Sequence, residues 1–243
     1  MIDLDKFPDI PETDIEEQAQ NLVEDYFYNS DWELKAPVPV ERIAESHLGY
    51  DIEITDEGLF EDPDFLGGIH FDSKLIQVNG SIEDQEGRYN FTIAHELGHH
   101  CLHKEVFQEM ETNGGIMCRE QGNKPIAERQ ADYFAASLLM PRKLVMKAFD
   151  DVFGDTDAIE LTAKNKHKLG VIANRVMKRG NFDNVSLTAM ANRLIGIGLI
   201  KGIGYQSKVI PEIEITTISG VGKYYLSILR RLMRRVLSNR RIR

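Results

Sequence analysis

Apolar positions recur at helical spacing along much of the chain. Behind a capping box of Thr13 and Glu16, apolar residues follow every three or four positions, which predicts a helix over residues 14–28. The same period predicts further helices over 87–103, between the prolines at 125 and 141, and near 158–168, 170–179, 186–196 and 223–238.

Strand-like patterns lie before residue 80. A strand is predicted over 50–54, and GGIHFDSKLIQVNG predicts a hairpin from Gly67 to Val78 that turns at Asp72 to Lys74. We therefore expect an α+β fold in the N-terminal part and a helical one afterwards.

Charge is divided unevenly along the chain. The net charge is −10, yet residues 1–160 carry 36 acidic and 12 basic side chains, whereas residues 161–243 carry 3 and 17. A basic last third is suited to nucleic acid or an acidic protein, and equally to docking on the acidic part of its own chain.

Composition favours a cytoplasmic protein. No run approaches the roughly 18 apolar residues of a membrane span, and the acidic start differs from a secretory signal. The two cysteines, Cys101 and Cys118, are too few for a disulfide framework.

The stretch FTIAHELGHHCLH holds four of the seven histidines. On a helix, His95 and His99 lie on one face and can bind one Zn²⁺ ion, at about 2.0–2.1 Å. Glu96 is displaced around the helix, where its carboxylate can take a proton from a water that zinc has made acidic.

A catalytic zinc needs a third protein ligand, and the next predicted helix supplies a candidate. Glu128 can complete the ligand set, and Asp132, one turn later, can accept the free ring N–H of a ligand histidine. Mn²⁺ or Fe²⁺ would also suit two histidines and one glutamate, so the metal stays open.

FTIAHELGHHCLH followed by ERQADYFAASLLMP resembles the ImmA/IrrE family of bacterial and phage metallopeptidases, as do PVPVERIAESHLGYDIEI, GGIHF and IQVN upstream. The resemblance implies that His95, His99 and Glu128 bind zinc, that Glu96 is the general base, and that Asp132 supports a ligand. His103 matches a family histidine and is expected to hold a ligand in place or to be structural, whereas His100 is expected at the surface.

The resemblance also implies a fold and a function. Residues 1–142 are expected to form a zincin-like peptidase domain, 143–204 a helical region like a helix-turn-helix, and 205–243 a basic extension. The activity implied is zinc-dependent cleavage of a protein partner, such as a transcriptional repressor or an antitoxin-like protein. The alternatives are a DNA-binding or scaffold protein whose zinc fold is structural, and a zinc hydrolase of small amides.

Substrate contacts are less specified. The hairpin from Gly67 to Val78 could offer a strand edge to a peptide. A donor for the transition-state oxyanion is also needed, with His70, Arg88, Tyr89 and Tyr133 as candidates.

The basic third contains two features. Ser186 is placed to cap a helix that partly matches a helix-turn-helix-like segment of the family. YYLSILRRLMRRVLSNRRIR predicts an amphipathic basic helix that could contact an anionic membrane, phosphates or a partner, or dock on its own protein.

Overall fold

The computed structural model describes residues 7–30, 33–61, 64–110, 117–118 and 125–207. All of these belong to one compact unit. The helix predicted near 223–238 lies outside the described residues. Within the described part, no helix has the length and apolar character to cross a bilayer.

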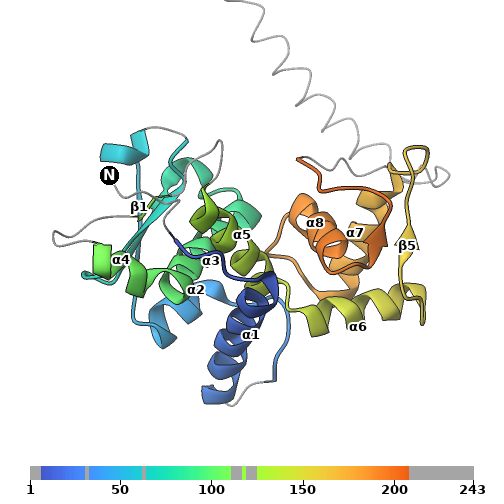
Figure 1. The fold of residues 1–243 in the computed structure, drawn as a ribbon, viewed down its shortest axis with the longest axis horizontal. Coiled ribbons are helices and arrows are strands. Elements are labelled where there is room, and N and C mark those ends of the chain that lie inside the picture. Colours follow the sequence, from blue (N-terminus) through green and yellow to red (C-terminus); the bar gives the residue numbers. More distant parts are fainter. Residues whose placement is uncertain (1–6, 31–32, 62–63, 111–116, 119–124, 208–243) are drawn as a thin grey trace, which may run out of the picture. The chain divides into compact units, whose positions relative to one another are not determined.

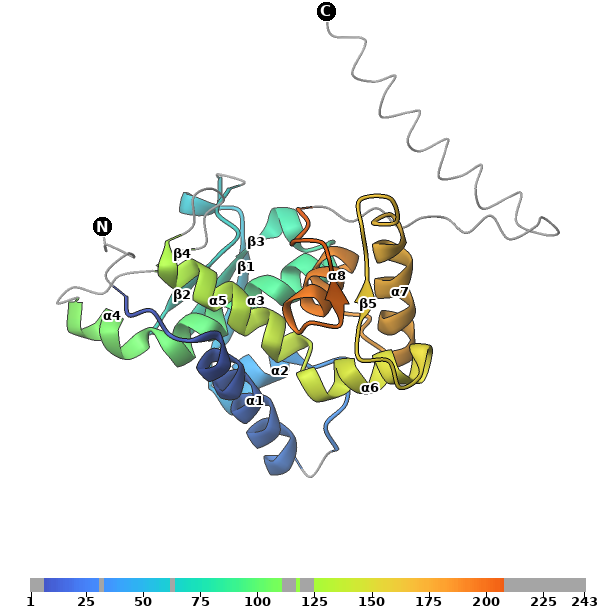
Figure 2. The same cartoon turned by 45° about the vertical axis from the view of Figure 1, so that its right-hand side comes forward.

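A four-stranded sheet lies in the N-terminal part (Figures 1 and 2). Its strands are β1 (Asp51–Thr55), β2 (Gly67–His70), β3 (Leu75–Asn79) and β4 (Met117–Cys118), in the order β1-β3-β2-β4. β1 runs parallel to β3, whereas β2 runs antiparallel to both β3 and β4. The predicted hairpin and the first strand are thus confirmed.

The expectation that the hairpin offers an open edge is wrong, because both of its strands have a neighbouring strand on each side. β3 lies between β1 and β2, and in β2 Gly68 and Ile69 pair with Cys118 and Met117. Among the described strands, the outer ones are β1 and β4.

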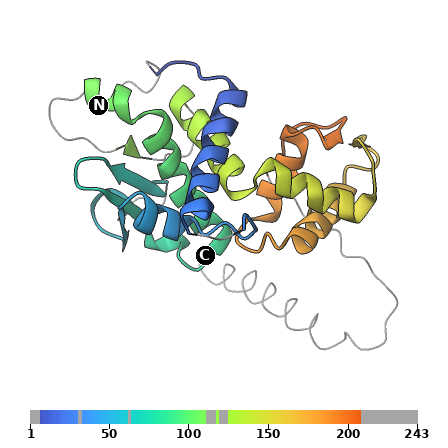
Figure 3. The same ribbon diagram turned by 90° about the horizontal axis from the view of Figure 1, so that it is seen from below.

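Helices cover this sheet and fill the middle of the unit (Figures 2 and 3). They are α1 (Glu12–Asn29), α2 (Val40–Arg42) with a π-helical turn over Ile43–His47, α3 (Glu86–Leu102), α4 (Lys104–Met110) and α5 (Ile126–Leu139). α3 packs against β2 and β3, α5 packs along α3, and α1 packs along α5. The described part is therefore a mixed α+β fold with a small sheet and many helices.

α1 begins earlier than the capping box predicts. Its N-cap is Pro11, no side chain caps it, and Thr13 already lies inside the helix. Glu16 forms ion pairs with Arg142 and Arg193 instead of bonding to the helix start. The prediction fails because two charge-assisted partners outweigh one backbone N–H.

The C-terminal part of the unit is a group of helices (Figure 3). They are α6 (Arg142–Phe153), α7 (Lys168–Gly180) and α8 (Leu187–Gly196), beside a short parallel pair of β5 (Ile159–Glu160) and β6 (Ile200–Lys201). The helix predicted near 158–168 is wrong, because Ile159 and Glu160 pair with Ile200 and Lys201 of a distant strand. The cap is confirmed: the Ser186 hydroxyl accepts from the backbone N–H of Ala189.

Arg193 fastens α8 to the rest of the unit. This buried side chain donates to the carbonyl oxygen of Met140 at 3.0 Å and to the hydroxyl of Ser137 at 3.2 Å, and it pairs with Glu16. The helix that carries Glu128 is thus connected through its far end to both α1 and α8.

Candidate metal centre

The middle of α3 is buried all around its circumference. Residues 92–99 are all buried, and among them are the charged or ionisable side chains of His95, Glu96 and His99. The sheet lies against one side of this helix and α5 against another. Polar groups are seldom buried without a partner that offsets their lost hydration, so this stretch is the candidate functional site.

Three side chains converge at this position. Nε2 of His95 lies 3.1 Å from Nε2 of His99, and the two Glu128 oxygens lie 3.2 Å from the first nitrogen and 3.1 Å from the second. Ligands about 2.0–2.1 Å from a tetrahedral zinc ion are about 3.3 Å apart, which is close to these spacings. The Glu128 oxygens are buried and accept no well-aligned hydrogen bond from the described residues. The donor set therefore fits a divalent metal ion.

Gly98 explains how Glu128 reaches the two histidines. A Cβ at this position would lie 3.0 Å from Cα of Ala131 and 3.2 Å from Cβ of Phe134, both on α5. Only a glycine lets the two helix backbones approach this closely. Gly98 thus sets the separation between His95 and His99 on α3 and Glu128 on α5.

Comparison with known proteins agrees with this geometry. Residues 39–177, more than half of the chain, match the IrrE N-terminal-like domain that defines the Peptidase_M78 family. The chain belongs to this family. A segment of 83 residues is also 31% identical to the metallopeptidase ImmA of Bacillus subtilis strain 168. That segment is 34% of this chain and 44% of the relative, so the match spans less than half of the relative's length.

In this Peptidase_M78 chain, Asp132 orients His95. Oδ1 of Asp132 lies 3.0 Å from Nδ1 of His95. A carboxylate accepts, so Nδ1 carries the ring proton and Nε2 presents its lone pair to the metal position.

A longer chain of hydrogen bonds orients His99. Nε2 of Gln130 donates to the carbonyl oxygen of Pro8 at 2.8 Å, which leaves the Gln130 oxygen to accept from Nε2 of His103 at 2.9 Å. Nδ1 of His103 is then an acceptor, and it lies 2.9 Å from Nδ1 of His99. His99 must therefore donate from Nδ1 and offer the Nε2 lone pair to the metal.

The charge of Glu128 favours one positive charge beside it, among His95, His99 and the space between them. Burial alone lowers the pKa of His95, but the Glu128 carboxylate and the hydrogen bond to Asp132 outweigh it and raise this pKa to about 9. Burial raises the pKa of Glu128, but His95 and His99 outweigh it and hold it below the usual value. The carboxylate is thus charged, and either a proton on His95 or a metal ion balances it.

For His100 and His103 burial is not outweighed, so the net shift of the pKa is downward. Burial lowers the pKa of His103 to about 3. The ring is therefore neutral, which lets its Nδ1 accept the hydrogen bond from His99. His100 is half-buried and not at the surface as expected, because its Nδ1 lies 2.8 Å from the Tyr50 hydroxyl. Burial lowers the pKa of His100 to about 4.

Glu96 faces the start of β2. The side chain is fully buried, and a Cβ on Gly67 would lie 3.1 Å from its Oε1 and would collide with Thr92. Gly67 therefore lets the sheet approach the Glu96 carboxylate closely.

The four oxyanion candidates lie in different surroundings. His70 contacts Gln77 on the neighbouring strand, with 2.9 Å between Nε2 and Oε1, and Arg88 is exposed in the first turns of α3. The Tyr89 hydroxyl hydrogen-bonds to Glu41, and Tyr133 contacts Arg142. None of these contacts involves the converging ligands, so the oxyanion donor stays a prediction.

Sequence analysis missed Gln130 and the segment that holds it. Gln130 is buried and links His103 to the carbonyl oxygen of Pro8. The rings of Phe7 and His103 make an edge-type contact with their centroids 5.1 Å apart. The only signal in the sequence was a glutamine on the helix face that also carries an apolar stripe. Its partner lies 122 positions away, beyond the reach of local patterns.

Proposed function

We propose that the protein is a zinc-dependent endopeptidase that cleaves a specific protein partner, such as a transcriptional repressor or an antitoxin-like protein. The observation that carries this proposal is the convergence of His95, His99 and Glu128, with the Glu96 carboxylate on the next position of the same helix. Membership of Peptidase_M78 and the similarity to the metallopeptidase ImmA support it.

The residues have distinct roles in this proposal. His95, His99 and Glu128 would hold the ion, and Asp132 and His103 would fix the ring orientations of the two histidines. A bound zinc ion supplies Lewis-acid chemistry, which polarises a carbonyl group and makes water more acidic. Glu96 would take the proton from the attacking water and deliver it to the amine nitrogen of the leaving peptide.

We propose zinc as the metal because two imidazole nitrogens and one carboxylate form a common catalytic zinc set. Mn²⁺ and Fe²⁺ accept the same donors and compete where they are abundant. Elemental analysis of protein purified without chelators decides which ion is carried.

We also propose that the chain consists of three parts with different roles. Residues 1–142 would form the zincin-like peptidase part, and 143–204 a helix-turn-helix-like part in which α7 and α8 pack together. Residues 205–243 would be a basic extension with affinity for nucleic acid or an acidic partner. The expected location is the cytoplasm.

The decisive experiment is Glu96→Gln. The family resemblance implies a partner that is encoded beside the protease. The product of the neighbouring gene is therefore incubated with the zinc-loaded protein, and cleavage is followed by mass spectrometry. Loss of the general base should slow cleavage by roughly 10²–10⁴-fold while the zinc content stays at the wild-type level. Glu105→Gln, at an exposed position of α4, is the matched control and should cleave normally.

Two outcomes would contradict the proposal. Cleavage at the wild-type rate by Glu96→Gln would remove Glu96 from the chemistry. If the biological effect of the protein survives in this variant with no cleavage, the DNA-binding or scaffold alternative is correct.

A further inference from the structure

The edge of the sheet at β1 is open. In the order β1-β3-β2-β4, β1 has a neighbour on one side among the described strands. The backbone N–H of Asp51 donates to the carbonyl oxygen of Lys74, just before β3, so every second residue from Asp51 turns its backbone groups to β3. The backbone groups of Ile52 and Ile54 therefore point away from the sheet. In the part of the chain that the structure describes, these outward groups have no hydrogen-bond partner.

The face of the sheet that packs on α3 stays apolar up to this edge. One row across the strands is Ile69, Ile76 and Ile52, and the next row ends with Val78 and Ile54. The side chains on β2 and β3 in these rows are fully buried, whereas Ile54 is 41% exposed. A further strand beside β1 with an apolar residue at this position would cover Ile54 and extend the buried face.

The opposite face of β1 carries carboxylates. Nε2 of Gln77 donates to Oε2 of Glu53 at 2.6 Å, and Oε1 of Gln77 lies 2.9 Å from Nε2 of His70, so the Glu53 carboxylate is held in place across three strands. Asp51 on the same face is also exposed. The strands β1, β2 and β3 contain no lysine or arginine. Basic side chains on this face of an added strand would therefore be stabilised.

We propose that the β1 edge binds an extended segment of a protein partner, antiparallel to β1, in which apolar and basic side chains alternate. Apolar residues opposite Ile52 and Ile54 would exchange N–H and C=O bonds with them, and the residue between would bring a basic side chain opposite Glu53. A second copy of this chain fits less well, because pairing Ile52 with Ile54 of the other copy places Glu53 opposite Glu53. Nucleic-acid phosphates would be repelled by the same carboxylates.

This edge is a separate place from the metal centre. The strand that approaches Glu96 is β2, at Gly67. β1 lies two strand spacings from β2, or about 10 Å, so an added strand would lie about 14 Å from β2. The proposal therefore holds whether or not the chain hydrolyses peptides.

The test is a titration of the ¹⁵N-labelled full-length chain, followed by NMR and by amide exchange in D₂O. The probe is a blocked peptide of about seven residues in which lysine and valine alternate. Binding should be saturable and should slow the exchange of the Ile52 and Ile54 amide protons by at least about tenfold. The amide proton of Glu53 already faces β3 and should change little. A peptide that alternates glutamate and valine should bind at least about tenfold more weakly.

Methylated peptides test the pairing on the unaltered protein. Methyl groups on the backbone nitrogens of the valines remove the donors that face β1, so binding should be lost. Methyl groups on the backbone nitrogens of the lysines point away from β1 and should weaken binding by less than about threefold. The two peptides have the same composition and charge, so a difference between them reports the backbone hydrogen bonds.

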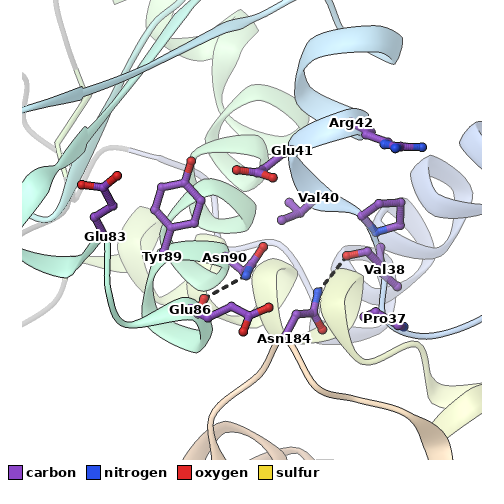
Figure 4. A pocket seen from close by; sticks show the side chains of 11 residues that line it. Pro37, Val38, Val40, Glu41, Arg42, Glu83, Glu86, Tyr89, Asn90 and Asn184 are labelled. Atoms are coloured by element: carbon purple, nitrogen blue, oxygen red, sulfur yellow. Dashed lines mark hydrogen bonds between the residues drawn. The ribbon is translucent and has the colours of Figure 1, made fainter.

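Variants of the protein locate the binding. Glu53→Lys should weaken the lysine–valine peptide by about three- to tenfold. Glu86→Lys makes the same change at another acidic place, the cavity that Glu41, Glu83 and Glu86 line near the N-terminal end of α3 (Figure 4), and should leave the binding unchanged. Ile54→Pro removes an outward N–H that β3 does not use, and it should abolish binding.

Four results would overturn the proposal. They are the absence of saturable binding, binding without protection of Ile52 and Ile54, equal weakening in Glu53→Lys and Glu86→Lys, and a stronger effect of methylation at the lysines than at the valines. Self-association of the chain that Ile54→Pro abolishes would assign the edge to a second copy and would overturn it too. If Ile54→Pro does not fold, the methylated peptides make the same test on the wild-type chain.

Discussion

Gln130 is a side chain that should affect zinc affinity without itself binding the metal ion. In Gln130→Leu, Nε2 of His103 loses its acceptor, and nothing then fixes which ring nitrogen of His103 faces His99. We expect zinc affinity to fall by about 10–100-fold, as for other residues that orient a ligand histidine. Competition with a chromophoric chelator measures this affinity.

The control for this variant is Gln108→Leu, at an exposed position of α4. It makes the same chemical change away from the relay and should keep the wild-type zinc affinity. Equal zinc affinities for the two variants would mean that the hydrogen bonds from Gln130 through His103 to His99 do not influence metal binding.

The side chains that could be predicted are those that belong to a recognisable spacing motif on one helix. Spacing alone selects His95, Glu96 and His99, and a second helix with carboxylates one turn apart selects Glu128 and Asp132. The structure brings the ligand atoms together, whereas their catalytic roles stay predictions. Gln130 could not be found this way, because its importance comes from a contact with Pro8 that only the folded chain makes.

At the scale of elements, the separation of α3 and α5 controls the ligand geometry. Gly98→Ala would place a methyl group 3.0 Å from Cα of Ala131, so the two helices must move apart. We expect a loss of about 1–3 kcal/mol in the free energy of unfolding, with weaker zinc binding because Glu128 moves away from His95 and His99. Urea unfolding and chelator competition measure the two effects.

Gly196→Ala is the control for this change. A Cβ there would meet only the end of the largely exposed Tyr205 side chain, at 3.0 Å, so the substitution should leave zinc affinity unchanged. An unchanged affinity in Gly98→Ala as well would show that the helix separation does not limit metal binding.

The pairing of Glu16 joins α1 to α6 and α8, and it depends on pH. Burial raises the pKa of Glu16, but Arg142 and Arg193 outweigh it and lower this pKa from its ordinary value of 4.5. The carboxylate therefore stabilises the fold fully above pH 4.5, and this contribution is lost as the pH falls through the lowered folded-state pKa. Glu16→Gln should be less stable than wild type at pH 7, and the difference should shrink in acid.

Urea midpoints of wild type and Glu16→Gln between neutral and acidic pH measure this difference. Subtraction of the two curves cancels the titration of the metal ligands, which both proteins share. Glu17→Gln, one position along on the exposed face, should show no such trend. A difference that grows as the pH falls would have the wrong sign.

Element prediction succeeded where a period extends over several turns, as in α3, α5 and α8. It failed at 158–168, where the local pattern is helical but Ile159 and Glu160 pair with Ile200 and Lys201. A strand of two residues gains its stability from the partner strand, so its own sequence carries little signal. The predicted capping box at Thr13 was also wrong, because Glu16 forms ion pairs with Arg142 and Arg193, which lie on helices distant in sequence.

At the scale of the whole molecule, Arg193 connects the N-terminal and C-terminal parts of the described unit. Arg193→Met leaves the carbonyl of Met140 and the Ser137 hydroxyl without this donor and removes one partner of Glu16. We expect a loss of about 3–5 kcal/mol in the free energy of unfolding. Arg179→Met removes an exposed ion pair with Asp151 and should cost about 1 kcal/mol or less. Similar losses in the two variants would contradict a connecting role for Arg193.

The attachment of Gln130 to Pro8 has a practical consequence for mutagenesis. The acceptor is a main-chain oxygen, so every amino acid placed at position 8 supplies it, and a scan of single substitutions there would report a tolerant site. A chain that starts after residue 10 would lack the oxygen altogether. Comparing N-terminally trimmed proteins for retained metal would expose a dependence that point mutations conceal.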